Sequence, residues 1–218
     1  MSSNLIAPPK LVGHRIAATE NDPIDAALFE YLLAGNGLFL RARRREFAVS
    51  LPLSLQKISG LPNGAIGISW INSRIPASLW EAILRHSRQM HTASSFKEEV
   101  YLIYWDNLLS EWQWHASGRE SNWASTIADD TLPEYANCCI ELHTHPPGAL
   151  DFSRADDRDE LGKFRIFAIL IDVHDKPKIR FRSGVYEHLI PIPAVWVGEM
   201  PEGLIDLNEI DALVEMLS

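Results

Sequence analysis

The sequence has few cysteines and no long hydrophobic run, and each of these absences excludes a class of protein. Its two cysteines, Cys138 and Cys139, are adjacent, so a bond between them would be strained, and two are too few for a disulfide framework. We therefore expect a reducing compartment. No segment approaches the roughly 18 apolar residues of a membrane-spanning helix, and no charged start precedes an apolar run. The expected location is the cytoplasm, without membrane contact.

Basic charge is also scarce. The 218 residues carry a formal net charge of −9, which weighs against nucleic acid as a partner because phosphate binding depends on Lys and Arg. One basic cluster, Arg41, Arg43, Arg44 and Arg45, could contact an acidic partner, although a solvated turn explains it more simply. Hydrophobic residues make up 46% of the chain and charged residues 22%, values typical of a globular protein with a packed core.

The pattern of apolar residues and turns predicts an α+β fold in two parts, residues 1–64 and residues 65–218. In the first part, Asp22-Pro23 is a helix-start signal, and the apolar residues that follow it have helical spacing. A helix is therefore predicted over residues 24–34, and a strand, turn and strand over residues 37–53. The first part is thus expected to be a small α+β module.

The second part is expected to form a mixed or antiparallel sheet with flanking helices. Turn residues separate short runs of β-branched and aromatic residues, a pattern typical of strands, and residues 116–134 are predicted to be a loop. The predicted helices cover residues 76–90, 153–162 and 207–217, and the predicted strands cover residues 65–71, 100–105, 111–115, 138–143, 165–173 and 179–185.

One short segment combines residue types that bind zinc. His143 and His145 are two residues apart, so on an extended strand both imidazoles point to the same side. Pro146-Pro147-Gly148 then redirects the chain, and a helix that starts near Ser153 would bring Asp156, one turn in, back over the histidines. Two histidines and one carboxylate leave the fourth tetrahedral position for water, which is the arrangement of catalytic rather than structural zinc sites.

Each of these residues also has a simpler explanation. An isolated His-x-His pair is more often exposed or hydrogen-bonded than bound to a metal, and Ser153 with Asp156 could form only a helix cap. The combination at this spacing favours Zn²⁺. Cys138 and Cys139 are not expected to be ligands, because they begin a buried strand and lack further cysteine spacing. No ligand spacing is seen for His14, His86, His91, His115, His174 or His188.

The run His143-Thr144-His145-Pro146, with Ser153 and Asp156 downstream, resembles the JAMM signature of the JAB/MPN zinc metalloproteases, which include deubiquitinating isopeptidases. The resemblance covers about residues 65–195 and implies an MPN/JAB-like fold, related to that of cytidine deaminase. More narrowly, residues 36–42 together with residues 152–160 resemble the PRTRC-system protein A group. That group is found in bacterial cassettes that also encode a ThiF-like activating enzyme and a ParB-related protein.

The resemblance also implies roles for these residues. His143, His145 and Asp156 would bind Zn²⁺, and Ser153 would stabilise the oxyanion. A glutamate on the strand that starts near residue 98 would be the general base. Zinc lowers the pKa of bound water from 15.7 to about 7, and a nearby carboxylate can then accept its proton.

Two adjacent residues, Glu98 and Glu99, are candidates for this base. They point to opposite faces of a strand, so only one of them can face the metal. Glu99 is preferred, because an apolar residue follows it at once, as in the PRTRC-system group, and Glu98 is the alternative. The family usually has a glycine three residues after the glutamate, where this chain has Leu102 or Tyr101. This departure puts the local strand packing in doubt, but not the metal ligands.

Other residues near this segment leave alternatives open. Glu141 shares the strand face of the histidines and could fix a histidine tautomer or pair with an arginine. The acidic residues after Asp156 are expected to form a solvated face, although Asp159 could support the site. Two alternating tryptophans could line a peptide groove, but core packing explains them more simply. These acidic and aromatic residues are Asp157, Asp159, Glu160, Trp112 and Trp114.

The expected function is therefore that of a zinc-dependent peptidase or isopeptidase. By resemblance, its substrate would be a ubiquitin-like or sulfur-carrier protein, and a ThiF-like activating enzyme would be a candidate partner. The alternative is a non-catalytic MPN-type scaffold in a plasmid or PRTRC-type cassette. A nucleic-acid enzyme is a third reading, prompted by the ParB-related neighbour and the arginine cluster, and the net charge weighs against it.

Overall fold

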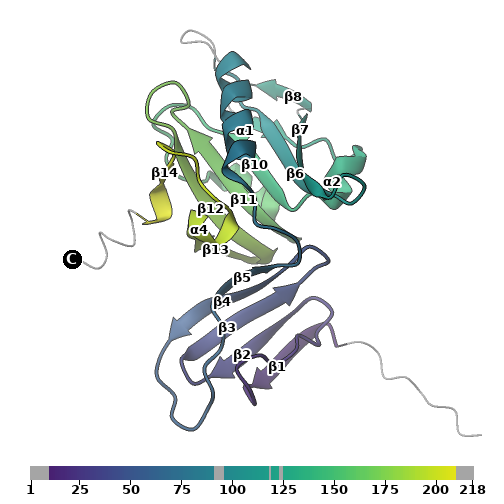
Figure 1. Ribbon diagram of the computed structural model, residues 1–218, viewed down its shortest axis with the longest axis vertical. Coiled ribbons are helices and arrows are strands. Elements are labelled where there is room, and N and C mark those ends of the chain that lie inside the picture. Colours follow the sequence, from purple (N-terminus) through teal and green to yellow (C-terminus); the bar gives the residue numbers. More distant parts are fainter. Residues whose placement is uncertain (1–9, 91–95, 118, 123–124, 210–218) are drawn as a thin grey trace, which may run out of the picture. The chain divides into compact units, whose positions relative to one another are not determined.

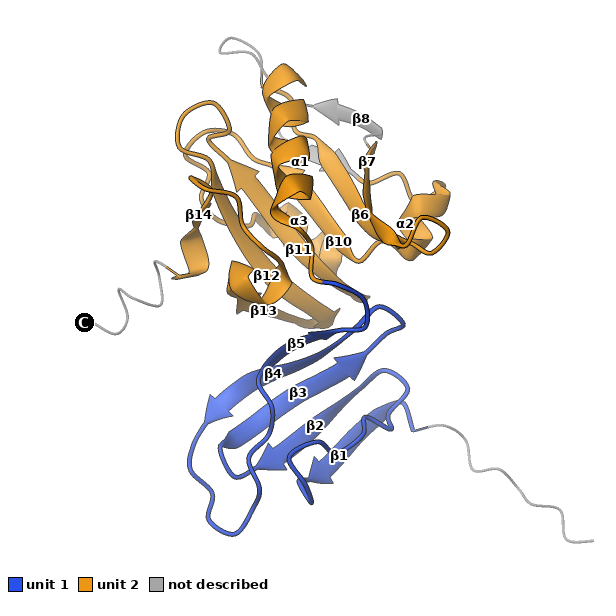
Figure 2. Ribbon diagram, viewed as in Figure 1, with its two compact units in different colours: residues 1–73 blue, residues 74–218 orange. Residues whose placement is uncertain are grey.

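The computed structural model describes residues 10–90, 96–117, 119–122 and 125–209, and it divides the chain into two compact units. The units are residues 1–73 and residues 74–218, coloured separately in Figure 2. This division falls later than residue 64, the boundary expected from the sequence. The reason is that residues 67–70 form the last strand of the N-terminal sheet.

The N-terminal unit is a five-stranded sheet in the order β1-β2-β3-β4-β5 (Figure 1). Its first two strands are parallel and the others are antiparallel. The strands are β1 (Val12–Ile16), β2 (Phe29–Ala34), β3 (Gly37–Arg43), β4 (Phe47–Leu55) and β5 (Gly67–Trp70).

The helix predicted over residues 24–34 is wrong. Residues 29–34 form β2, and the described residues of this unit contain strands but no helix. Ala34 pairs with Gly37, so Gly35-Asn36 is a two-residue hairpin loop, a signal that favours strands over a helix. Arg41, expected in a solvated turn, is instead buried on β3 and lies 3.4 Å from Glu30.

The C-terminal unit is built on a mixed seven-stranded sheet, which confirms the predicted α+β class. The main strand order is β13-β12-β11-β10-β6-β7, and β14 pairs with β12. The central pair β10 and β11 is parallel, and β6 pairs with β10 antiparallel. The strands are β6 (Val100–Asp106), β7 (Glu111–Ser117), β10 (Ile140–Thr144), β11 (Lys163–Ile171), β12 (Lys178–Tyr186), β13 (His188–Ile192) and β14 (Ile205–Asp206).

Among the described residues, four helices and a small hairpin complete this unit. The helices are α1 (Ala77–Met90), α2 (Pro133–Asn137), α3 (Arg154–Glu160) and α4 (Ala194–Val197), and the hairpin strands are β8 (Arg119–Asn122) and β9 (Ser125–Ile127). The prediction of one loop over residues 116–134 is therefore wrong, because polar residues there pair as strands. Most of the helix predicted over residues 207–217 lies outside the described residues. In the described part of the chain, no helix is long and apolar enough to cross a membrane.

The two faces of the seven-stranded sheet carry different helices. Helix α1 lies over one face (Figure 1), where Trp80 packs edge-on against Phe181 of β12 with ring centroids 5.6 Å apart. Helix α3 lies over the opposite face and is joined to β12 through Arg182. Strand β10 runs between β6 and β11, so its residues alternate between the α1 face and the α3 face.

Candidate metal centre

The two histidines belong to β10 and to the residue that follows its end. His143 lies opposite Val100 of β6. His145 continues the pairing with β11, because its backbone N–H donates to the carbonyl of Leu170 at 2.9 Å. Both side chains therefore lie on the α3 face of the sheet, and each is only 5% exposed.

Helix α3 brings Asp156 to these histidines. Ser153 is its N-cap, and the Ser153 hydroxyl accepts hydrogen bonds from the backbone N–H groups of Ala155 and Asp156, at 3.2 Å each. The Asp156 carboxylate accepts the N–H of Ser153 in return at 2.5 Å, which completes a capping box. The carboxylate then lies 3.4 Å from His145 Nε2 and 3.9 Å from His143 Nδ1. The three predicted ligands are therefore neighbours.

The electrostatics of these groups favour a cation. Burial opposes ionisation of Asp156, but hydrogen bonds from His145 and Ser153 outweigh it and lower the pKa of Asp156 to about 2. Burial also disfavours a charged His143, yet the neighbouring carboxylates, Glu141 first among them, raise its pKa. The surplus of negative charge around His143 thus stabilises positive charge at this position, whether a proton or a metal ion carries it.

Two distances between the donor atoms are close to those of a zinc site. Nitrogen and oxygen ligands lie about 2.0–2.2 Å from zinc, so two tetrahedral ligands are separated by roughly 3.3–3.5 Å. His145 Nε2 and Asp156 Oδ2 are already 3.4 Å apart, and His143 Nδ1 needs to approach Asp156 Oδ1 by a few tenths of an ångström. Among the described residues, no group of three or more His, Cys, Asp or Glu side chains is arranged so that it could hold a metal ion as it stands. Two imidazoles and one carboxylate are nonetheless the donor set of an open, catalytic zinc site.

Ser153 combines two properties at the edge of this site. Its oxygen is occupied as an acceptor by two backbone N–H groups of α3. Its hydroxyl proton is still able to donate, and the residue is exposed. It can therefore act as helix cap and as hydrogen-bond donor to a substrate at the same time.

The structure separates the two candidate bases. The Glu99 carboxylate accepts the Tyr101 hydroxyl at 2.5 Å and lies 4.0 Å from His86 Nδ1 of α1. Tyr101 lies opposite Leu142, which points away from the His143 face. Glu99 is therefore on the α1 face, away from the two histidines.

Glu98 precedes the first residue of β6 by two positions. The backbone N–H of Thr144 donates to the carbonyl of Glu99 at 2.9 Å, so the contact of this segment with β10 extends to Glu99. If the same alternation continued for one more residue, Glu98 would lie opposite His145, on the face of the two histidines. Both glutamates also line a cavity of about 270 Å³ beside the start of β6.

Charged residues that the sequence did not single out surround the site. Arg165 Nη1 donates to Glu141 at 2.8 Å, which confirms the expected pairing with an arginine, and Glu141 also lies 3.4 Å from His143 Nε2. Burial opposes ionisation of Glu141, but contacts with His143, Lys163 and Arg165 lower its pKa to about 2. Lys163 and Arg165 lie 22 and 24 residues from Glu141, too far for a local sequence pattern to indicate the pairing.

The acidic face of α3 is only partly solvated. Glu160 is 1% exposed and accepts Arg182 Nε at 2.6 Å, and Asp157 accepts Arg182 Nη1 at 2.7 Å. Burial raises the pKa of Glu160 to about 7, although Arg182 opposes the shift. The prediction of a solvated face is therefore wrong for Glu160, while Asp159 is exposed as expected. Arg182 holds α3, and with it Asp156, against the sheet.

The remaining candidates have structural roles. Trp112 packs edge-on against Trp105, with ring centroids 5.6 Å apart, and Trp114 packs against His86 at 5.2 Å, which favours core packing over a peptide groove. Cys138 and Cys139 are buried and not disulfide-bonded, and His91 lies outside the described residues. A scan of known protein families finds no model that matches this chain, and a search of curated proteins finds no similar sequence.

Proposed function

We propose that this protein is a zinc-dependent peptidase or isopeptidase of the JAMM (JAB/MPN) type, with Zn²⁺ held by His143, His145 and Asp156. One observation carries the proposal. Asp156, placed by the capping box of α3, lies within 4 Å of both histidines of a buried strand. A mixed sheet with flanking helices is also what an MPN/JAB-like fold of the PRTRC-system protein A group requires.

Each residue of the proposed site has a separate role in hydrolysis. When bound, Zn²⁺ supplies a Lewis acid that polarises a carbonyl and acidifies water. Asp156 stays anionic, because its pKa is lowered to about 2. The exposed Ser153 hydroxyl donates to the carbonyl oxygen as that oxygen gains negative charge. A glutamate accepts the proton of the attacking water and returns it to the leaving amine.

We assign the general base to Glu98. The assignment is supported by the Glu99 carboxylate, which accepts the Tyr101 hydroxyl on the α1 face, and by the alternation of strand residues, which would turn the preceding Glu98 to the other face. A base must reach the water to within hydrogen-bond distance, directly or through one further water. Glu99 would first have to leave Tyr101 and cross the edge of the sheet.

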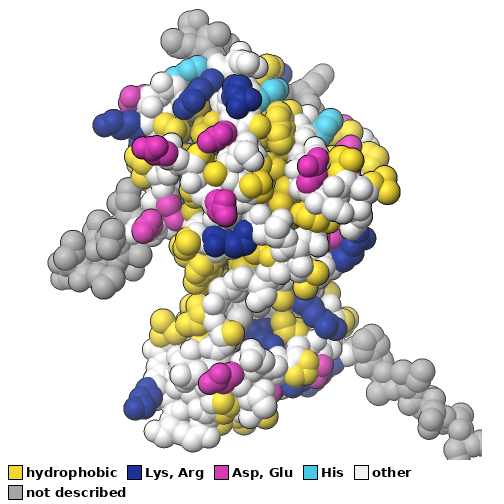
Figure 3. Space-filling view, viewed as in Figure 1, with side chains coloured by type: hydrophobic (Ala, Val, Ile, Leu, Met, Phe, Trp, Pro, Cys, Tyr) yellow, Lys and Arg dark blue, Asp and Glu magenta, His cyan; other side chains and the backbone are white. Residues whose placement is uncertain are grey.

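The substrate follows from the resemblance alone, a weaker support than the site. We propose a ubiquitin-like or sulfur-carrier protein conjugate, with a ThiF-like activating enzyme as partner. We also propose a cytoplasmic location, where cysteines such as Cys138 and Cys139, which are not disulfide-bonded, stay reduced. Nucleic acid is not proposed as a ligand, since acidic and basic side chains are interspersed on the face seen in Figure 3.

The test compares metal content and cleavage in two matched variants. Asp156→Ala removes a ligand, and Asp159→Ala removes an exposed carboxylate from the same helix. We expect about one equivalent of zinc in the wild type and in Asp159→Ala, and almost none in Asp156→Ala. Cleavage of peptide and isopeptide-linked substrates should follow the zinc content and stop with a chelator.

Two results would contradict this proposal. Equal zinc content in wild type and Asp156→Ala would exclude the site. Full zinc occupancy without chelator-sensitive cleavage of any substrate would favour the non-catalytic scaffold instead.

A further inference from the structure

We propose that Glu141 is a positioning residue that fixes which nitrogen of His143 binds the metal. Glu141 holds Nε2, so Nδ1 is the ligating atom, while His145 ligates through Nε2. This inference rests on the proposed metal site and adds to it a defined pair of donor atoms and a residue that selects one of them.

The orientation of the two rings carries the argument. His143 Nε2 lies 3.4 Å from Glu141 Oε1, and His143 Nδ1 lies 3.9 Å from Asp156 Oδ1. The two nitrogens of one ring are therefore turned to two different carboxylates. His145 is oriented differently, with Nε2 at 3.4 Å from Asp156 Oδ2. Asp156 thus faces the Nδ1 atom of one histidine and the Nε2 atom of the other.

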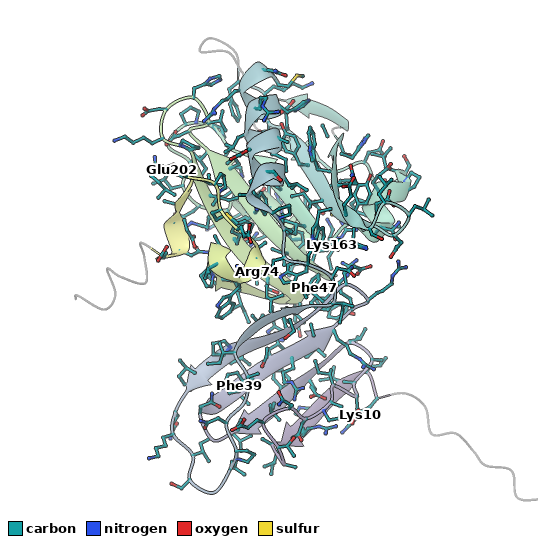
Figure 4. All side chains as sticks on the ribbon, in the orientation of Figure 1. Lys10, Phe39, Phe47, Arg74, Lys163 and Glu202 are labelled. Carbon is teal, nitrogen blue, oxygen red and sulfur yellow. The ribbon has the colours of Figure 1, made fainter. Side chains whose placement is uncertain are left out.

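Glu141 can fix the ring because it is itself fixed from the other side. Its Oε2 accepts Arg165 Nη1 at 2.8 Å and lies 3.4 Å from Nζ of Lys163 (labelled in Figure 4). The Arg165 guanidinium stacks on the Tyr135 ring at 4.0 Å and donates to the Tyr135 carbonyl at 2.5 Å. Two side chains of β11 therefore hold the Glu141 carboxylate, and helix α2 holds one of them, Arg165, in place.

Glu141 does not need the contact with His143 in order to be buried as a charged group. A buried carboxylate needs charged partners, and Arg165 and Lys163 already supply them to Glu141, which is 2% exposed. Its other oxygen is turned to the histidine. A carboxylate that accepts the second N–H of a ligating histidine fixes the tautomer, and removing such a partner typically costs about 10–100-fold in metal affinity.

The first test needs no variant. In metal-free wild-type protein at alkaline pH, where the imidazole is neutral, ¹⁵N NMR should show His143 with its proton on Nε2. With ¹¹³Cd in the site, scalar coupling should reach Nδ1 of His143 and Nε2 of His145. A proton on Nδ1, or coupling to Nε2 of His143, would overturn the assignment. Absence of cadmium and zinc binding would defeat the proposed function, while the metal-free spectrum would still report on Glu141.

The second test measures zinc affinity by competition with a chelator. Glu141→Gln keeps the shape of the side chain and removes its charge, and Asp159→Asn makes the same change on the exposed side of α3. We expect affinity to fall about 10–100-fold in Glu141→Gln and to stay unchanged in Asp159→Asn. An affinity of Glu141→Gln equal to that of the wild type would overturn the role of Glu141. If Glu141→Gln does not fold, the wild-type spectra decide the question.

Discussion

The two faces of the seven-stranded sheet bury different kinds of side chain. The α1 face is packed with aromatic rings, among them Trp80 against Phe181 and Tyr101 against Trp114. The α3 face buries a connected set of charged and polar groups, each no more than 9% exposed: Glu141, His143, His145, Asp156, Glu160, Arg165 and Arg182.

This difference indicates which face was shaped by function. Taking an ion out of water costs several kcal/mol, and well-packed apolar residues often replace a buried ion pair without loss of stability. The α1 face shows that this sheet can be covered by apolar packing. The charges of the α3 face therefore find an explanation in the proposed metal site that they surround.

The largest effect is expected from the two adjacent glutamates, which lie on the two faces. Glu98→Gln should lower kcat by about 10²–10⁴-fold, the usual contribution of a general base. Glu99→Gln should lower it by less than about 10-fold, because Glu99 is bound to Tyr101 on the α1 face. Steady-state kinetics with zinc-saturated enzyme would measure both. A larger loss of kcat in Glu99→Gln than in Glu98→Gln would show that Glu99 leaves Tyr101 and reaches the metal. The α1 face would then also contribute to the chemistry.

Arg182 tests whether α3 is held by charge. Arg182→Met removes the cation paired with Glu160 at 2.6 Å and should lower the free energy of unfolding by about 3–5 kcal/mol. Adding Glu160→Leu should restore much of that loss, because no unpaired carboxylate remains buried. Denaturant titrations of the metal-free proteins would measure this. A double variant as unstable as Arg182→Met would mean that the packing of the guanidinium on Phe152, 3.7 Å from the ring centroid, holds the helix instead.

The sequence was sufficient for the parts of the site that local spacing determines. His143 and His145 share a face because strand residues alternate, and Ser153 and Asp156 form a capping box three residues apart. Most strand boundaries in the C-terminal unit were also predicted within a few residues. The helix predicted over residues 24–34 failed because sheet pairing across Gly35-Asn36 overrode a helical spacing of apolar residues.

The contacts between distant residues could not be predicted. Arg182 is 22 residues from Glu160, and Arg165 is 24 residues from Glu141. Nothing in the local pattern relates the members of either pair. The sequence also could not show which glutamate faces the histidines, because the face of each glutamate depends on the pairing of β6 with β10. That pairing is fixed by the sheet and not by the residues that follow each glutamate.

Glu160 should give the α3 face a pH dependence that apolar packing lacks. Burial raises its pKa from an ordinary value of 4.5 to about 7, so the folded protein binds this proton more tightly than the unfolded chain. The resulting stability is fully present below pH 4.5 and is lost as pH rises through 7. Relative to Glu160→Gln, the metal-free wild type should lose about 1–3 kcal/mol between pH 5 and 7.5.

Denaturant titrations at several pH values, with chelator present, would measure this difference. Glu160→Gln is the matched reference, because it mimics the protonated side chain and keeps an acceptor for Arg182. A wild type that gains stability over Glu160→Gln as pH rises would show that Arg182 keeps Glu160 ionised throughout.

The smallest effect is expected at Ser153, and it concerns how each helix is held. Helix α1 has fourteen residues and is held by packing, whereas α3 has only seven, too few for a stable isolated helix. The cap of α3 should therefore matter. Ser153→Ala should lower the unfolding free energy by about 1 kcal/mol, and Ser153→Thr, which keeps the capping oxygen, should lower it by less. Denaturant titrations of the metal-free variants would measure this. Equal stability of wild type and Ser153→Ala would mean that Arg182 alone holds α3, and that Asp156 reaches the histidines without help from the cap.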